Sequence, residues 1–462
     1  MDNQLQLLNF HKMLANFANN LVGAFMILIV YQYTGSLAAA MVYGISTHLL
    51  RLVINIVFDK AKLFSRYPQL LLLLRAIPII SYNILVILLE LDFNVWFCII
   101  GICIFQSFDY GLNNVSKEII FNYSSLNKSG GSLGLTRVFE QIGTIVALIA
   151  GGMLLDLSPI LVVCISITLY LISVVPLVNY YIKSRKSKTF NKDAISNAVE
   201  VLDKKENAAT SSKKLSKQLL ITYGFVYFSF AFLDLMTGMF NLSVYISQGS
   251  FTTAGILSAI FNVVYMVGSY IAGDLNEKKD LSIFISICCA VIGISVLFLP
   301  YIATNLDTMF WAVCVIYGII GILYPFVSIF VLQRMLSKTR IVGCSNNALI
   351  IREEACVVAY SAGYAMGFVS IPAIFILMSV ALIASAGIIP ICEEKTRKNL
   401  VDYLQNNEVT HSKKRKKAPA PKKAVAIKDA KEEKVSDAKS STTENKKSVE
   451  DTKPSTTKKS DK

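Results

Sequence analysis

The sequence predicts an all-α integral membrane protein, in which twelve transmembrane helices form two pseudo-symmetric six-helix bundles. Three observations lead to this fold class. Hydrophobic residues make up 54% of the 462 residues and charged residues only 16%, whereas a soluble domain carries about a quarter charged residues. Apolar runs long enough to cross a bilayer recur along the chain. Basic residues occur in alternate connections between these runs, as expected when each run reverses the direction of the chain.

The apolar runs define the spans in order. A helix needs about 20 apolar residues to cross the hydrocarbon core of a bilayer. Runs of this kind are separated by short polar or turn-forming segments. The predicted spans are residues 10–33, 37–58, 70–89, 94–115, 133–155, 159–182, 219–240, 252–273, 281–300, 308–330, 346–368 and 370–391.

The positive charges predict how the spans are oriented. Every second connection between the spans carries basic residues, among them Lys60, Lys117, Lys278 and Arg334. Since basic loops stay on the cytoplasmic side, we expect a multi-pass protein of the cell membrane with both termini in the cytoplasm. No Lys or Arg occurs in the six connections predicted to lie outside, at 34–36, 90–93, 156–158, 241–251, 301–307 and around 369.

Polar segments divide the chain into four predicted parts. An N-terminal six-helix bundle (1–182) is followed by a basic cytoplasmic linker (183–218), a C-terminal six-helix bundle (219–392) and a Lys-rich tail (393–462). The tail has too few apolar residues to bury a core, so we expect it to be disordered and cytoplasmic. Its basic run at 413–417 is predicted to be solvated, and contact with anionic lipid is the alternative.

Signatures of enzymes and of metal sites are missing from the sequence. The nine Cys residues are scattered, without the spacing of zinc ligands or of a disulfide framework. No Walker loop, HExxH or GxSxG motif occurs. The excess basic charge belongs to the linker and the tail. We therefore expect no enzymatic activity, no cofactor and no nucleic acid partner.

A weak internal repeat relates the two bundles. The turn after the first span, at 33–36, reads YTGS, and the turn after the seventh span, at 247–250, reads SQGS. Each turn is followed by a long apolar span and then by a short charged turn. Repeats of this kind place a substrate site between the halves, near the middle of the bilayer.

Two charged turns carry a family resemblance. Residues 273–279 (GDLNEKK) resemble the G-x-L-x-D-[RK] signature of the major facilitator superfamily, with Glu277 in the place of the acid. In the first half Asp59 and Lys60 keep the charges, but Asn55 replaces the glycine. Together with the six-plus-six arrangement and the basic central linker, these residues make the chain resemble that superfamily over about 1–391.

Two further segments are similar to one branch of the superfamily. Residues 70–76 (LLLLLRA) are similar to the start of the third span in the macrolide-efflux-like branch of drug:proton antiporters. Gly143, Gly151 and Gly152 resemble the glycine-rich fifth span of exporters, although the proline of that pattern is missing. The resemblance implies a transporter that works by alternating access.

The resemblance also implies two ionic gates on the cytoplasmic side. In the family, span 2 packs against span 11 and span 5 against span 8, which brings charged residues together between the halves. Opposite charges there would form a latch that breaks when the halves rock. Arginines that snorkel to the headgroups are the alternative. The predicted gate and motif residues are Asp59, Lys60, Arg51, Arg137, Glu140, Gly273, Glu277, Lys278, Arg352, Glu353 and Glu354.

Two acids inside spans are candidates for proton coupling. Asp234 lies about fifteen residues into span 7, too deep to reach the headgroups, and Asp109 in span 4 is the second choice. Burial disfavours a charged carboxylate and so favours proton uptake, which a coupling site needs. The alternative is a protonated Asp that hydrogen-bonds a neighbouring helix.

Polar side chains in the spans are predicted to line the substrate path. Asn16, Asn19 and Asn20 share one face of span 1, and Asn262 and Tyr265 lie in span 8. Hydrogen bonds between helices would explain these residues equally well.

The resemblance implies a monomeric secondary transporter that takes a small-molecule substrate in the lipid bilayer. Proton-coupled efflux of a small amphipathic compound is the leading prediction. One alternative is a nutrient importer of the same fold, for a sugar or a peptide. The other is a polytopic sensor or scaffold that does not transport. Protons would drive transport, and no bound cofactor is expected.

Overall fold

The computed structural model describes residues 3–60, 68–126, 130–186, 213–278, 282–342 and 345–417 of the chain. The chain divides into two compact units, Met1–Asn406 and Asn407–Lys462. The first unit contains all the predicted spans, and the fold and the site described below belong to it. Throughout the described residues the only regular secondary structure is helical.

Among the described residues, the first half of this unit has eight helices, and two of its spans each consist of two of them. The first span is broken into two helices at Phe25, and the third is broken at Arg75. In chain order the helices are α1 (Asn3–Gly23), α2 (Met26–Thr34), α3 (Leu37–Lys60), α5 (Pro68–Leu74), α6 (Ala76–Glu90), α7 (Val95–Leu126), α8 (Gly130–Leu157) and α9 (Pro159–Lys186).

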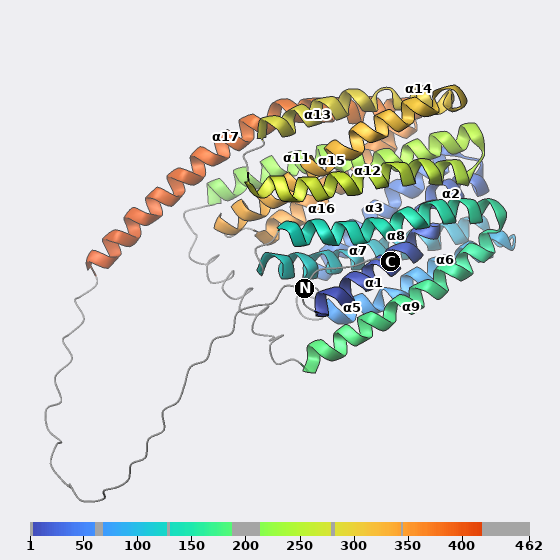
Figure 1. Cartoon of the computed structure of the whole chain (residues 1–462), viewed down its shortest axis with the longest axis horizontal. Coiled ribbons are helices and arrows are strands. Elements are labelled where there is room, and N and C mark those ends of the chain that lie inside the picture. The colour runs from blue at the N-terminus through green and yellow to red at the C-terminus, as the bar shows by residue number, and fades with distance from the viewer. Residues whose placement is uncertain are drawn as a thin grey trace, which may run out of the picture. The chain divides into compact units, whose positions relative to one another are not determined.

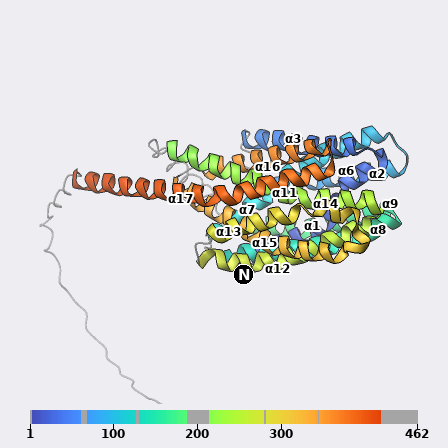
Figure 2. The same cartoon turned by 90° about the horizontal axis from the view of Figure 1, so that it is seen from above.

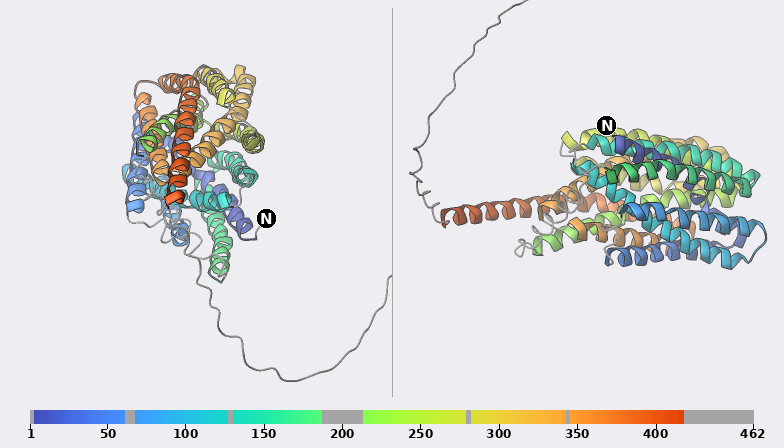
Figure 3. Two further views of the ribbon diagram at one scale, coloured as in Figure 1. Left: turned by 90° about the vertical axis from the view of Figure 1, so that its left-hand side faces the viewer. Right: turned by 90° about the horizontal axis from the view of Figure 1, so that it is seen from below.

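In the part of the second half that the structure describes there are seven helices, and the ninth span is divided into two of them. The helix of the tenth span has a kink at Met309 and contains Pro325. In chain order the helices are α11 (Lys213–Gln248), α12 (Phe251–Lys278), α13 (Ser282–Val296), α14 (Leu299–Thr304), α15 (Leu306–Val342), α16 (Ser345–Gly367) and α17 (Ile371–Lys417). Figure 1 shows these helices running side by side, and Figures 2 and 3 show the same bundle from above, from one end and from below.

The helices confirm the predicted fold class. Eleven segments of the described residues are long and apolar enough to cross a membrane, and they coincide with eleven of the twelve predicted spans. The remaining span, predicted at 346–368, corresponds to the 23-residue helix α16. This helix carries Arg352, Glu353 and Glu354, which lower its hydropathy. The chain is therefore an all-α membrane protein whose helices form twelve spans in two bundles.

The two halves meet along three pairs of helices. α8 packs against α12, α3 packs against α16, and α2 contacts α11. The first two pairs are the contacts between spans 5 and 8 and between spans 2 and 11 that the family resemblance implied. Residues that face these contacts are therefore the ones through which one half can act on the other.

The internal repeat is visible in the two turns that begin the second span of each half. Gly35 and Gly249 both have positive φ angles, +60° and +67°, a conformation that other residues adopt only at a cost. The serine after each glycine caps the next helix. Ser36 Oγ accepts from the backbone N–H of Ala39, and Ser250 Oγ accepts from that of Thr253. The end of the bundle with these turns is called the outer end below, after its predicted orientation.

The last helix differs from the sequence prediction. The tail was expected to be disordered from residue 393, but α17 continues to Lys417. Residues 393–417 are rich in Lys, Arg and Glu, which favour helices, and Glu394 and Lys398 form an exposed ion pair one turn apart at 2.9 Å. Residues 418–462 lie outside the described part of the chain.

Candidate functional site

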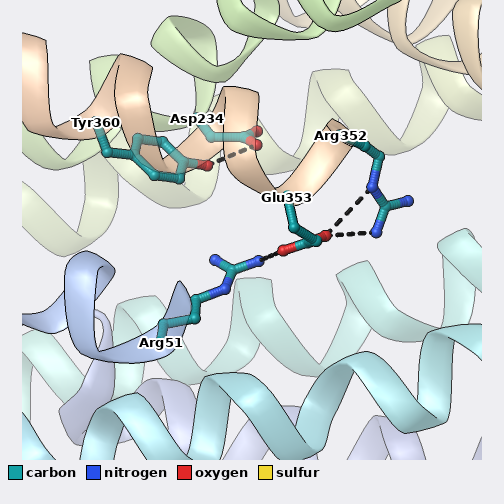
Figure 4. Close-up of polar contacts among 5 residues, drawn as sticks. All are labelled: Arg51, Asp234, Arg352, Glu353 and Tyr360. Carbon is teal, nitrogen blue, oxygen red and sulfur yellow. Dashed lines mark hydrogen bonds and ion pairs between the residues drawn. The ribbon is translucent and has the colours of Figure 1, made fainter. Parts of the chain in front are cut away.

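A chain of three charged side chains joins the two halves. Glu353 on α16 accepts two hydrogen bonds from Arg352 of the same helix, at 2.6 Å from Nη2 and 3.2 Å from Nε. The other oxygen of the same carboxylate accepts from Arg51 Nη2 on α3, in the first half (Figure 4). These side chains are only 12–19% exposed. One carboxylate thus holds two arginines, one from each half.

Aromatic rings surround Arg51 on α3. Its guanidinium lies 5.8 Å from the centre of the Tyr110 ring, a cation–π distance. His48, one turn earlier on the same face, stacks against Tyr360 and Tyr364 of α16, with ring centres 4.2 Å and 5.9 Å apart. Arg51 Nε and His48 Nδ1 are buried and have no hydrogen-bond partner among the residues that the structure describes. The contact between α3 and α16 is thus aromatic as well as ionic.

Asp234 on α11 lies beside this chain of charges. Its Oδ1 accepts a hydrogen bond from the hydroxyl of Tyr324 on α15. Its Oδ2 accepts one from the hydroxyl of Tyr360 on α16 at 3.1 Å (Figure 4). Both tyrosines are 8% exposed, whereas the Asp234 side chain is exposed. Three helices therefore meet at a carboxylate that remains accessible from one side.

The acid and the ion pairs form one polar cluster. Glu353 and Tyr360 lie two turns apart on α16, and Cys356 stands between them. We call Arg51, Asp234, Arg352, Glu353 and Tyr360 the interface cluster. Because it contains members from both halves, its contacts must change when the halves move.

The second acid predicted for proton coupling lies elsewhere. Asp109 on α7 pairs with Arg75 at the break between α5 and α6, with 2.5 Å from Nε to Oδ1 and 3.4 Å from Nη2 to Oδ2. The two side chains are 1% and 3% exposed. This pair joins spans 3 and 4 within the first half.

The second predicted gate is described only in part. Glu140 on α8 belongs to the gate predicted between spans 5 and 8, and the structure pairs it with Lys12 on α1 at 2.7 Å. Glu354 is exposed next to Glu353 on α16. The other predicted gate and motif residues lie on helices α3, α8 and α12, but their side-chain positions are not among those that the structure describes. They are Asp59, Lys60, Arg137, Gly273, Glu277 and Lys278.

Most of the predicted path residues bond to neighbours within their own half. Asn19 accepts from the hydroxyl of Tyr82 on α6, and Asn20 donates to Thr144 Oγ1 on α8 at 3.1 Å. Asn262 donates to the carbonyl of Ser258 one turn earlier at 2.7 Å. Asn16 is partly buried on α1.

Tyr265 is the path residue that lies near the interface cluster. Its ring centre is 5.4 Å from that of Tyr324, which donates to Asp234. The sequence analysis singled out neither Tyr324 nor Tyr360, although Tyr360 follows Glu353 by two helical turns, a spacing that puts both on one face of α16. No group of three or more His, Cys, Asp or Glu side chains among the described residues is arranged to hold a metal ion.

Comparison with known proteins decides the family. Residues 13–343 match the family model described as Major Facilitator Superfamily. The chain belongs to the major facilitator superfamily. Among solved structures, it resembles one described as "Crystal structure of a bacterial homologue of iron transporter ferroportin in outward-facing state with soaked iron". The TM-score is 0.55 at 14% identity, over 86% of this chain and all (100%) of that one.

Membership of the major facilitator superfamily makes the chain a multi-pass membrane protein with a transporter fold. The likeness to the ferroportin homologue concerns the fold alone, because the identity is only 14%. A comparison with curated proteins finds no match. The superfamily match does not separate one branch from another.

Proposed function

We propose that this member of the major facilitator superfamily is a proton-coupled secondary transporter that exports a small amphipathic compound by alternating access. One observation carries the proposal. Asp234 is an exposed carboxylate inside a bundle of membrane helices, and it is held by tyrosines from two further helices beside the ion pair that joins the halves. A group of this kind can bind and release a proton while sensing the contact between the halves.

Proton uptake by Asp234 would change its contacts in a defined way. The carboxylate accepts from both tyrosine hydroxyls, but a protonated carboxyl has one donor and fewer acceptor sites. At least one of the two bonds would then weaken or rearrange. Because Tyr324 and Tyr360 belong to α15 and α16, protonation of Asp234 would loosen the junction of three helices. α16 also carries Glu353, which pairs with Arg51 of the other half.

The Arg51–Glu353 pair supports a gating role. Separating a partly buried ion pair leaves each charge in need of water or of a new partner. Glu353 keeps Arg352 as a partner when Arg51 leaves, since Arg352 lies on the same helix. The cost of opening therefore falls mainly on Arg51. A substrate or water that reaches Arg51 would lower that cost and favour the open state.

Export and the class of substrate rest on the similarity of residues 70–76 to the macrolide-efflux-like branch. The aromatic rings around the interface cluster also suit a compound with an apolar body. We further propose a monomer in the cell membrane with both termini in the cytoplasm, which the distribution of basic residues supports. A nutrient importer and a membrane sensor or scaffold are the competing functions.

The test is transport by purified protein in liposomes with an imposed pH gradient. A pH-sensitive dye inside the liposomes reports proton movement when amphipathic compounds, sugars, peptides or ferrous iron are added. Asp234→Asn should abolish uphill transport and the linked proton movement, yet keep downhill exchange, because the amide cannot release a proton. Asp307→Asn is the matched control, since Asp307 is an exposed acid in the first turn of α15.

Two outcomes would contradict the proposal. Unchanged uphill transport by the Asp234→Asn variant would remove Asp234 as the coupling site. A protein that moves none of the compounds, but whose effect on cells is lost when residues 393–462 are deleted, would favour the sensor or scaffold.

A further inference from the structure

At the outer end, one carboxylate of the first half binds the start of a helix of the second half. Asp156, near the end of α8, accepts from the backbone N–H of Phe251 at 3.0 Å and from that of Thr252 at 2.8 Å. It also accepts from the hydroxyl of Ser250 at 3.0 Å. All three donors belong to the first turn of α12 and the residue before it. We call these four residues the Asp156 clasp.

The start of α12 is a favourable place for a negative charge. The first N–H groups of a helix have no partner within the helix and form its positive end. α12 already has a cap of its own, because Ser250 Oγ accepts from the N–H of Thr253 at 3.2 Å. Asp156 satisfies two further N–H groups, and does so with a charged acceptor, which strengthens the bonds. The helix is therefore capped once from its own half and once from the other.

The surroundings of the clasp close the contact between the halves at this end. A Cβ atom on Gly152 would lie 3.1 Å from the Cα of Thr252, so the two backbones touch. The Phe251 ring packs edge-on against Phe25 of the first half, with centres 6.0 Å apart. Tyr31 of α2 contacts Tyr245 of α11 in the same way at 6.4 Å. The outer end is thus sealed by helices α2, α8, α11 and α12 around the clasp.

We propose that Asp156 is a positioning residue that sets how often the halves part at the outer end. The inference rests on the alternating-access part of the proposed function, and not on the proton site or the substrate. Arg51 lies fourteen residues into α3 from Leu37, about 21 Å from the level of the clasp. The clasp and the interface cluster therefore act at different depths. Opening the outer end breaks the clasp, and water can then hydrate both partners, so the clasp biases the equilibrium without locking it.

Hydrogen–deuterium exchange of the full chain in nanodiscs tests the proposal without substrate or pH gradient. In Asp156→Ala, exchange should rise together in the outer ends of α2, α8, α11 and α12. The expected rise is about tenfold, as the loss of one or more hydrogen bonds to a charged group implies. Ser158→Ala is the matched control, because Ser158 Oγ caps α9 at the same end through the N–H of Leu161, within one half. It should affect only the first turn of α9.

A double variant distinguishes a role of Asp156 in linking the halves from a role in helix capping alone. In Asp156→Ala combined with Ser250→Asp, the link from residue 156 is gone and the new aspartate can cap α12 from its own half, since Asp is a good capping residue. If Asp156 matters only as a cap, this double variant should exchange like the wild type, and that result would overturn the proposal. If the clasp joins the halves, exchange at α2 and α11 should stay raised.

The pattern of exchange decides the remaining cases. A rise confined to the first turn of α12 in Asp156→Ala would also overturn the proposal. If that variant does not fold, Ser250→Ala removes one of the three clasp bonds together with the Ser250–Thr253 cap. It should raise exchange in the first turn of α12 and, by less than tenfold, over the same four helices. Failure of proton coupling at Asp234 would leave these results unchanged, because exchange is measured at one pH in the absence of transport.

Discussion

At the scale of single residues, the Arg75–Asp109 pair shows how an acid inside a membrane protein can be structural. Both side chains are almost completely buried, and Arg75 donates to both carboxylate oxygens. A buried charge that loses its partner destabilises a protein. Replacing both members of the pair by apolar residues of similar size is often tolerated. The geometry therefore favours a role for Asp109 in holding α7 against the break between α5 and α6.

We predict that Asp109→Asn destabilises the protein by about 3–5 kcal/mol, because Arg75 would keep its charge without a charged partner. The double variant Arg75→Leu with Asp109→Leu should unfold close to the wild-type temperature. Thermal unfolding in detergent measures both effects. If Asp109→Asn unfolds like the wild type but loses proton-coupled transport, Asp109 and not Asp234 is the coupling site.

The family resemblance brought Arg51 and Glu353 together, but sequence reasoning could not find the partners of Asp234 and Asp109. Asp234 stands out in the sequence because a carboxylate deep in an apolar run needs a reason. Its tyrosine partners are 90 and 126 residues away, and tyrosine is too common in membrane spans to attract notice. Arg75 lies in the apolar segment 70–76, but nothing in the sequence shows that it meets Asp109 and does not reach for the headgroups. Pairing depends on how helices rotate against each other, which one sequence does not record.

At the scale of elements, the contact between α8 and α12 depends on residues without side chains. A Cβ on Gly255 of α12 would collide with the carbonyl oxygen of Leu148 on α8. Such a collision involves backbone, which cannot move aside as a flexible side chain can. Gly238 of α11 is different, because nothing lies within 4 Å of a Cβ built there.

These two glycines give a matched prediction. Gly255→Ala should destabilise the protein by about 1–3 kcal/mol, the usual cost of overpacking a tight contact. Gly238→Ala should be neutral or stabilise by about 0.5–1 kcal/mol, because alanine favours a helix and meets no obstacle. Thermal unfolding of the two variants side by side is the measurement. Equal effects of the two changes would show that α8 and α12 are not in close contact.

Element positions were well predicted where hydropathy governs them, and poorly where tertiary contacts do. The predicted spans coincide with helices because an apolar run must span the bilayer with its backbone groups bonded. The breaks at Phe25 and Arg75 leave no such mark. Phe25 is fully buried against Phe251 of the other half, and Arg75 reaches Asp109. The extension of α17 was missed because low hydropathy was interpreted as disorder, although helix-forming residues predominate there.

At the scale of the whole molecule, the Arg51–Glu353 pair is where relative motion of the halves should be most easily blocked. Cysteines at positions 51 and 353, joined by a short bifunctional thiol reagent, should abolish transport, because they fix α3 to α16. Reducing the link should restore it. Transport in liposomes, before and after reduction, is the measurement. Cys356 should first be replaced by serine, since it lies one turn from position 353.

The control for this prediction is a link inside one half. His11 on α1 donates a hydrogen bond to the carbonyl oxygen of Ser173 on α9, and both residues belong to the first half. Cysteines at these two positions, linked in the same way, should leave transport intact if each half moves as a rigid body. Loss of transport with both links would mean that the halves do not rock as units.

The clasp at Asp156 has no counterpart on the other side of the molecule. By the internal repeat, the end of α16 corresponds to the end of α8, but the residues there are Gly367, Phe368, Val369 and Ser370, none of them acidic. The nearest contact to α3 at that level is the flexible side chain of Met41, beside Gly367. Without such a clasp, the α3–α16 edge would part first when the outer end opens, and the α8–α12 edge would part last, once the bonds of Asp156 are broken.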